Sequence, residues 1–250
     1  MIRKKTFTES LMNDASLQKG QHILDIGCAI GNLTLDIAKL IGPDGHVVGI
    51  DRNEKFLEMA REKAAQDGLK NVTFLRQDIY DLAYKEEFDV VTCRRVLMYL
   101  PDAVSAVEKM LSALRPKGQL ILQEHNLGQV HKSGSIPLNE EVLQILRKTL
   151  LSENADIEIG LKLDSILTKA GAGERFIQAQ SCLQTPHQIV PLGMILKAIQ
   201  DRIIACGAAS QDKLNALDLD TLDDRMILER RKNEISYVCE VIFGAIAAKE

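Results

Sequence analysis

Short runs of β-branched and aliphatic residues alternate along the chain with longer segments whose apolar residues recur every three or four positions. This alternation predicts an α/β fold: a doubly wound, mostly parallel sheet with helices on both faces. Seven runs are predicted as strands: residues 22–26, 47–50, 72–76, 88–93, 119–123, 175–183 and 235–245. Crossover helices are predicted over residues 32–41, from Asn53 as far as Gly68, and over 104–114.

Beyond Asn126 the pattern becomes mainly helical. Residues 131–137 are predicted as a loop, and helices are predicted over 138–151, 162–170, 192–205 and 213–231. We expect the segments 10–17, 138–151 and 192–205 to form a lid with an apolar wall at Met194, Ile195 and Ile199. The same stripe is also consistent with plain core or with the face of a homodimer. We divide the chain into an N-terminal helical cap (1–20), an α/β core (21–127), a helical insertion (128–172) and the remaining strands with their intervening helices (173–250).

A glycine-bearing segment lies at the turn between the first predicted strand and the first helix, where Asp25, Gly27, Ala29 and Gly31 stand at alternate positions. Glycine lets a backbone approach a ligand closely, and a helix N-terminus offers unpaired N–H groups with a positive dipole end. A dinucleotide fingerprint Gly-x-Gly-x-x-Gly beginning at Gly27 needs glycine where Ala29 and Asn32 stand. The turn therefore disfavours a nicotinamide-dependent oxidoreductase.

The turn instead resembles the first motif, acid-x-Gly-x-Gly-x-Gly, of the class I (Rossmann-like) S-adenosylmethionine-dependent methyltransferases, with alanine in the middle slot. Further segments are similar to that family: Asp51 closing strand two, Arg76-Gln77-Asp78-Ile79 after strand three, Phe88-Asp89-Val90-Val91 on strand four, and Leu114-Arg115-Pro116-Lys117-Gly118-Gln119-Leu120, where the family usually writes L-K-P-G-G. Gln119 replaces the second glycine of that late turn. The resemblance covers roughly residues 21–123.

The resemblance implies a cofactor, S-adenosylmethionine, which leaves as S-adenosylhomocysteine, and a sheet whose last strand is antiparallel. It implies that Asp51 holds both ribose hydroxyls, that Asp78 accepts from the adenine amino group and that Ile79 packs on the ring. The residues expected at the cofactor are Asp25, Gly27, Cys28, Ala29, Gly31, Asp51, Arg52, Asp78, Ile79 and Arg94. Taken singly, each glycine also fits a structural turn and each acid a solvated loop. Jointly they favour cofactor binding.

The catalysis that this resemblance implies needs no metal and no residue that bonds covalently to the substrate, because a sulfonium methyl group is already an activated electrophile. A base is needed only if the acceptor must lose a proton. His125 is the candidate base, since it directly follows strand five and imidazole titrates near neutral pH; an imidazole bonded to a loop carbonyl is the alternative. Tyr99 is a second candidate, or packs beside Pro101. Arg94 either faces the methionine carboxylate or pairs with an acid such as Glu124.

Composition and the end of strand four narrow the range of possible methyl acceptors. The chain has 31 Lys and Arg against 35 Asp and Glu, a net charge of −4, with no basic tract, which disfavours nucleic acid as a partner. Strand four ends in Thr92-Cys93-Arg94-Arg95, without the N/D-P-P-Y/F tetrad that grips the amine of a DNA base. Ten aromatic residues and no tryptophan make an aromatic cage for a quaternary amine improbable. A small-molecule acceptor is therefore expected.

Neither a signal peptide nor a membrane anchor is indicated, and five widely spaced cysteines without a C-x-x-C pair favour a reducing, cytoplasmic setting. The sequence thus predicts a methyltransferase that passes a methyl group to a small molecule by in-line displacement. The alternatives are a catalytically silent regulatory or scaffold protein on the same fold and, less favoured, a nicotinamide-dependent oxidoreductase. The acceptor, the methylated atom and the oligomeric state stay open.

Overall fold

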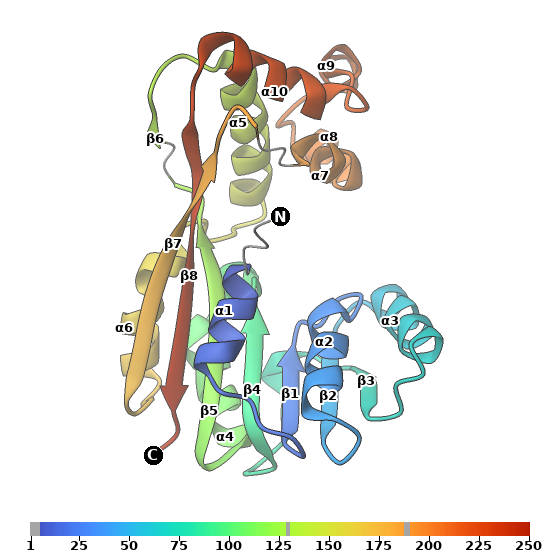
Figure 1. The fold of residues 1–250 in the computed structure, drawn as a ribbon, viewed down its shortest axis with the longest axis vertical. Coiled ribbons are helices and arrows are strands. Elements are labelled where there is room, and N and C mark those ends of the chain that lie inside the picture. Colours follow the sequence, from blue (N-terminus) through green and yellow to red (C-terminus); the bar gives the residue numbers. More distant parts are fainter. Residues whose placement is uncertain (1–5, 129–130, 188–190) are drawn as a thin grey trace. The chain divides into compact units, whose positions relative to one another are not determined.

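The computed structural model describes residues 6–128, 131–187 and 191–250 and shows an α/β protein (Figure 1). The predicted segments that begin at residue 1 or cross 129–130 and 188–190 lie partly outside the described residues. The strands are β1 (His22–Ile26), β2 (His46–Asp51), β3 (Val72–Arg76), β4 (Phe88–Arg94), β5 (Leu114–Asn126), β6 (His131–Lys132), β7 (Arg175–Gln184) and β8 (Tyr237–Ala248). They form one sheet in the order β3-β2-β1-β4-β5-β8-β6, with β7 paired to β8.

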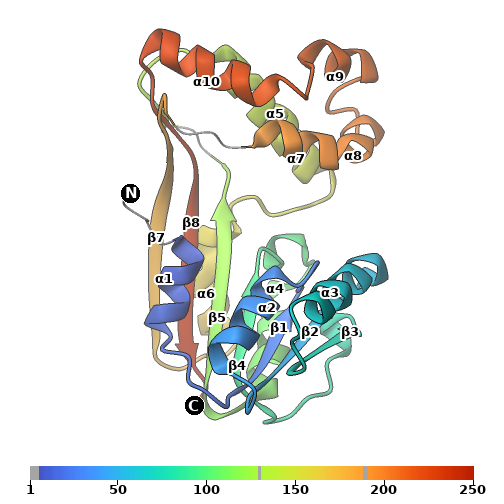
Figure 2. The same ribbon diagram turned by 45° about the vertical axis from the view of Figure 1, so that its right-hand side comes forward.

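The sheet is mostly parallel, as predicted. Strands β3, β2, β1, β4 and β5 run in the same direction, whereas β8 runs opposite to β5 (Figure 2). The sheet has one strand more than predicted because the two residues of β6 pair antiparallel with β8, where the sequence predicted only loop. A two-residue strand is too short to produce an alternating pattern, so the sequence gives no signal for it.

Helix α2 has its predicted ends, whereas the other predicted helices differ from the prediction at one or both ends. The α-helices are α1 (Phe7–Asp14), α2 (Asn32–Ile41), α3 (Glu54–Gln66), α4 (Ala103–Ala113), α5 (Pro137–Ser152), α6 (Leu163–Lys169), α7 (Leu192–Ala198), α8 (Gln200–Ala205), α9 (Gln211–Leu217) and α10 (Leu222–Asn233). Short 3-10 turns are η1 (Ile79–Asp81), η2 (Leu97–Tyr99) and η3 (Ile159–Lys162). The stretches 192–205 and 213–231, each predicted as continuous, are divided at Ile199 and at Asp218, whose φ is +46°.

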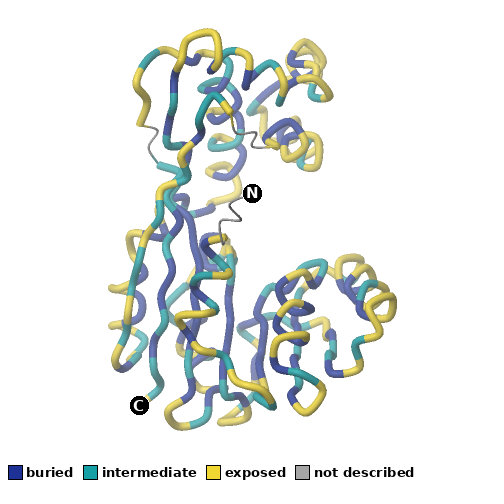
Figure 3. The backbone as a smooth tube through the Cα atoms, viewed as in Figure 1, coloured by how far each residue is buried: buried dark blue, intermediate teal, exposed yellow. Residues whose placement is uncertain are grey.

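Contacts divide the chain into two compact units. The first comprises Met1–Glu124, Ile159–Ala179 and Phe243–Glu250, and the second His125–Glu158 and Gln180–Ile242. In the first unit, α1, α2 and α3 cover one face of the sheet and α4 and α6 the other (Figures 1 and 2). Strands β1 and β4 are central and almost wholly buried (Figure 3). Burial on both faces explains why apolar residues in these strands, such as Ile23 with Leu24 and Val90 with Val91, are not confined to alternate positions.

The second unit has its own core, which draws apolar side chains from α5, α7, α8, α9, α10 and β8. A buried cation supports it: the Arg230 guanidinium donates from Nη1 to Asn139 Oδ1 at 2.7 Å and lies 5.7 Å from the ring centre of Tyr237. Two of the three segments predicted to form a lid, 138–151 and 192–205, fall in this unit, and their closure over a substrate stays a prediction. No helix among the described residues is both long and apolar enough to cross a bilayer.

Candidate active site

The first unit places its candidate site at the carboxyl ends of the parallel strands. The chain runs outward from β1 to β2 and β3 on one side, and β4 and β5 follow on the other, so the order reverses between β1 and β4. Ligands of open α/β sheets bind beside such a reversal, outside the carboxyl ends of the strands. The turn that leaves β1, residues 27–31, lies at this point.

The turn requires a left-handed backbone at three alternate positions. Gly27, Ala29 and Gly31 have φ values of +67°, +48° and +79°. A side chain at Gly27 would overlap Val96 Cγ2, and one at Gly31 would lie 2.9 Å from the Ala60 Cβ. Ala29 shows that the middle position tolerates a methyl group, at the strain that left-handed backbone imposes on a non-glycine residue. The two glycines are therefore needed for packing as well as conformation.

Asp25 lies beneath the turn and is buried. The hydroxyl of Thr34 donates to its Oδ2 at 2.6 Å, and that of Thr92 donates to its Oδ1 at 2.8 Å. Burial raises the pKa of this carboxyl, and the two hydroxyl bonds oppose that rise. Because both oxygens are engaged by neighbouring elements, Asp25 ties β1 to α2 and β4, which fixes the turn between them.

Replacing Thr34 with valine is expected to reduce the free energy of unfolding by about 1 to 3 kcal/mol, because it leaves one oxygen of the buried Asp25 carboxyl without a donor. Urea denaturation measures the change. The matched control is Thr73→Val, since Thr73 on β3 is only partly buried and bonds His46. A T34V loss no greater than that of T73V contradicts the anchoring role of Asp25.

Asp51, at the end of β2, folds back onto the turn. Its Oδ2 accepts from the Ala29 N–H at 3.0 Å, and its Oδ1 accepts from the Asn53 N–H at 2.8 Å. Asn53, where this helix was predicted to begin, caps α3 by accepting from the Lys55 N–H. The carboxylate that the resemblance assigns to a ribose thus stands directly against the middle residue of the glycine turn.

Asp78 follows β3, the next strand outward, and caps η1 by accepting from the Tyr80 N–H at 3.0 Å. Its other oxygen lies 3.5 Å from Arg52 Nη1, on a side chain that is 72% exposed. An exposed pair at that distance contributes little to stability. Ile79 beside it is buried. The structure therefore brings Asp51, Arg52, Asp78 and Ile79 together at the ends of β2 and β3.

Cys28 and Arg94 occupy different surroundings. Cys28 is buried in an apolar cluster with Ala60 and Phe74, and burial raises the pKa of its thiol, so it behaves as a small apolar residue. Arg94 ends β4 half-buried, and burial lowers the pKa of its guanidinium. The carboxylate of Glu124 accepts hydrogen bonds from the Val96 and Leu97 N–H groups instead of from Arg94.

The two predicted catalytic residues are also placed. Tyr99 is 44% exposed at the end of η2 in the first unit. His125 belongs to the second unit, where its Nδ1 is bonded to the carboxylate of Glu240 on β8, not to a loop carbonyl. Within the described residues its Nε2 has no hydrogen-bond partner. Glu240 is the single charged residue of β8, and that isolation was the available sequence signal for it.

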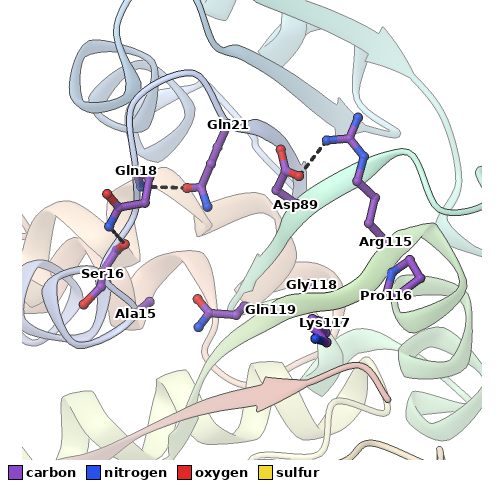
Figure 4. Close-up of a pocket in the computed structure, with 10 residues that line it drawn as sticks. All are labelled: Ala15, Ser16, Gln18, Gln21, Asp89, Arg115, Pro116, Lys117, Gly118 and Gln119. Carbon is purple, nitrogen blue, oxygen red and sulfur yellow. Dashed lines mark hydrogen bonds and ion pairs between the residues drawn. The ribbon is translucent and has the colours of Figure 1, made fainter.

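Two cavities of the first unit lie away from the carboxyl ends of the strands. One, of about 370 Å³, is lined by residues at the amino ends of β1, β4 and β5, among them Gln21, Asp89 and Arg115 (Figure 4). Arg115 Nη1 donates to Asp89 Oδ1 there at 2.6 Å. A second, of about 530 Å³, lies beside the end of α2 and includes Gly45 and Asn71. Neither is formed by the glycine turn, so cavity size does not identify the site.

Comparison with known proteins identifies the family. A family model described as a methyltransferase domain matches residues 17–174, more than half of the chain and all of β1 to β5. The chain belongs to the methyltransferase-domain family. This methyltransferase domain is 34% identical over 121 residues to demethylmenaquinone methyltransferase of Staphylococcus aureus, a match that covers 48% of this chain and 49% of that protein. The chain thus spans about half the length of the curated relatives it matches.

Solved structures share the fold of the methyltransferase domain. Phosphoethanolamine N-methyltransferase 2 of Haemonchus contortus, in complex with S-adenosyl-L-methionine, is 20% identical with a TM-score of 0.59, over 96% of this chain and 51% of that one. An S-adenosylmethionine-dependent methyltransferase of Aquifex aeolicus is 17% identical with a TM-score of 0.55, over 98% and 90% of the two chains. At these identities the likeness concerns the fold.

Proposed function

We propose that this domain transfers a methyl group from S-adenosylmethionine to a small-molecule acceptor. The observation that carries the proposal is the left-handed turn over Gly27, Ala29 and Gly31 at the carboxyl end of β1, with the Asp51 carboxylate against it. The family match and the cofactor-bound Haemonchus structure support the choice of cofactor.

The residues fit such a cofactor in chemical type. A backbone without side chains at Gly27 and Gly31 lets the amino-acid portion come close, and the first amides of α2 point toward it. A carboxylate acceptor such as Asp51 matches a ribose diol, and the acceptor Asp78 beside the apolar Ile79 matches an amino-bearing ring. When bound, S-adenosylmethionine supplies a methyl group on a positively charged sulfur.

The remaining predicted residues take roles consistent with their surroundings. Asp25 and Cys28 act as supports of the turn, because both are buried. Ala29 offers its N–H, which Asp51 shares in the free protein. Arg52 and Arg94 are proposed to face anionic or polar parts of the cofactor, and Tyr99 and His125 to serve the acceptor.

The acceptor is proposed to be a small molecule. The chain carries a net charge of −4, and the relatives named above act on a demethylmenaquinone and on phosphoethanolamine, both small molecules. In-line transfer requires the acceptor to be held against the sulfonium with water excluded. Acceptor binding and orientation are therefore the work that the protein itself must do.

Asp51→Ala is expected to weaken the binding of S-adenosylhomocysteine by about 1 to 3 kcal/mol, roughly 5- to 150-fold in Kd, because the ribose hydroxyls lose their acceptor. Isothermal titration calorimetry at fixed salt measures both proteins. Asp44→Ala is the matched control, since it removes one exposed carboxylate from the turn before β2.

The proposal is contradicted if the wild type gives no binding heat with S-adenosylhomocysteine, or if D51A and D44A bind it equally. Binding without methyl transfer to any of a broad acceptor panel identifies the domain instead as a cofactor-binding regulatory protein. A higher affinity for NAD than for S-adenosylhomocysteine identifies an oxidoreductase.

A further inference from the structure

Glu124 is a buried acid for which the sequence suggested only a pairing with Arg94. Its side chain is fully buried on β5, in the first unit. Its Oε1 accepts from the Val96 N–H at 2.9 Å and from the Leu97 N–H at 2.8 Å. Among the described residues, its Oε2 has no hydrogen-bond partner. A half-satisfied buried carboxyl is costly, so its retention calls for an explanation beyond packing.

The two amides that Glu124 holds begin the turn η2, which has no cap from the side chain of its own N-cap residue, Val96. The preceding residue, Arg95, is left-handed with φ +60° and donates its N–H to Gln123 O at 2.8 Å. A strained backbone persists only where the surroundings fix it. Glu124 and Gln123, both on β5, hold this backbone by accepting hydrogen bonds from the N–H groups of residues 95–97.

Val96 connects this turn to the candidate cofactor site. Its side chain fills the space that a Cβ on Gly27 would need. A shift of Val96 therefore changes the wall against which the glycine turn rests. Glu124 bonds the backbone of Val96, and the Val96 side chain packs against Gly27. Glu124 therefore acts on cofactor binding indirectly, by positioning Val96.

The surroundings of Glu124 make its hydrogen bonds to the Val96 and Leu97 amides sensitive to protonation of the carboxyl. Burial raises the pKa of its carboxyl to about 7, while the N–H groups of Val96, Leu97 and Met98 and the cation of Arg95 oppose the rise. Cys93 on β4 faces both Glu124 and Asp25 and is itself buried, with a thiol pKa raised by burial. His125 follows Glu124 in the chain. Ionised, the carboxylate forms charge-assisted bonds to the two amides, which are stronger than those to the neutral acid.

We propose that Glu124 is a proton-linked positioning residue of the cofactor site: by holding the Val96 and Leu97 amides it sets Val96 against Gly27, and its ionised form holds them more firmly. The inference rests on the proposed function, since it assigns Glu124 to the cofactor site. It predicts that cofactor affinity rises as the carboxyl loses its proton.

Calorimetric titration with S-adenosylhomocysteine at pH 6, 7 and 8 compares the wild type with Glu124→Gln and Glu124→Ala. Glutamine keeps an oxygen for the amides, so E124Q is expected to bind at pH 6 within about 3-fold of the wild type, whereas E124A binds about 10-fold more weakly. Between pH 6 and 8 the wild type is expected to gain about 3- to 10-fold in affinity relative to E124Q, whose profile contains the titrations of the ligand and of all other groups, so that the ratio isolates Glu124. Equal affinities for E124A and wild type, or a wild-type to E124Q ratio that does not change with pH, overturn the proposal.

Amide hydrogen exchange in the ligand-free protein separates this proposal from the proposed function. E124A is expected to speed exchange of the Val96 and Leu97 amides about 10-fold relative to the Val47 amide, which bonds Asn71 O at the amino end of β2. E124Q is expected to leave that ratio near the wild-type value. An unchanged ratio in E124A overturns the hold on η2. If wild type fails to bind S-adenosylhomocysteine while the ratio changes as expected, the cofactor assignment fails and the turn-holding role stands.

Discussion

Replacing Gly27 with alanine is expected to lower the free energy of unfolding by about 2 to 5 kcal/mol, since two costs add. The left-handed backbone at φ +67° costs a residue with a Cβ about 1 to 2 kcal/mol. The new methyl group would also overlap Val96, and overpacking of this kind costs about 1 to 3 kcal/mol. Urea denaturation followed by circular dichroism measures the loss.

Two variants separate these costs. Gly20→Ala is the matched control, because Gly20 has φ +82° but nothing within 4 Å of the added Cβ, so only the backbone cost remains. Adding Val96→Ala to G27A is expected to recover the overlap cost in a double-mutant cycle. A G27A loss equal to that of G20A, with no coupling to Val96, would show that the turn is not packed as described.

Stability is expected to fall by about 3 kcal/mol as pH rises from 4.5 to 7, relative to Glu124→Gln. The carboxyl of Glu124 has a folded-state pKa of about 7 against an ordinary value of 4.5. Between these values the folded protein holds a proton that the unfolded chain has released, so raising the pH favours unfolding. The contribution is fully present below pH 4.5 and lost above pH 7, with a slope of at most about 1.4 kcal/mol per pH unit.

Urea denaturation of wild type and E124Q at half-unit pH steps gives this difference directly. Other acids titrate in both proteins and cancel in the subtraction, provided that they do not contact Glu124. A flat difference between pH 4.5 and 7 would mean that this carboxyl titrates alike in the folded and the unfolded chain. The proton-linked part of its positioning role would then fail.

Local signals explain which parts of the fold were predictable. Strands β1 and β3 and helix α2 have the predicted ends. Their apolar pattern and the residues that start or stop them lie close together in the sequence, so local signals mark where they begin and end. Strand β5 is longer than predicted at both ends. The segment Arg115 to Gly118, which belongs to the late turn of the sequence analysis, is an irregularity within the strand, since Leu114 already pairs with Phe88 and the regular register resumes at Gln119 with Val90.

The candidate site divides in the same way. The glycine turn and its acids are visible in sequence because the motif is contiguous and each acid directly follows a strand. Pairings between residues distant in the sequence are not visible in this way: in the first unit Val96 packs against Gly27 from 69 positions later, and in the second unit Glu240 bonds a histidine 115 positions earlier. Such pairings are created by strand order, which a single sequence does not encode locally, so Glu124 and Glu240 acquire meaning only in the fold.

Diffraction from crystals grown with S-adenosylhomocysteine tests the central claim most directly. The account predicts the ligand at the carboxyl ends of β1 and β2, with its ribose hydroxyls on the Asp51 carboxylate, its adenine beside Asp78 and Ile79, and its amino-acid portion along Gly27 to Gly31. Density for the ligand in the cavity beside Gln21 and Arg115, or an Asp51 still bonded to the Ala29 N–H with the ligand bound elsewhere, would contradict it.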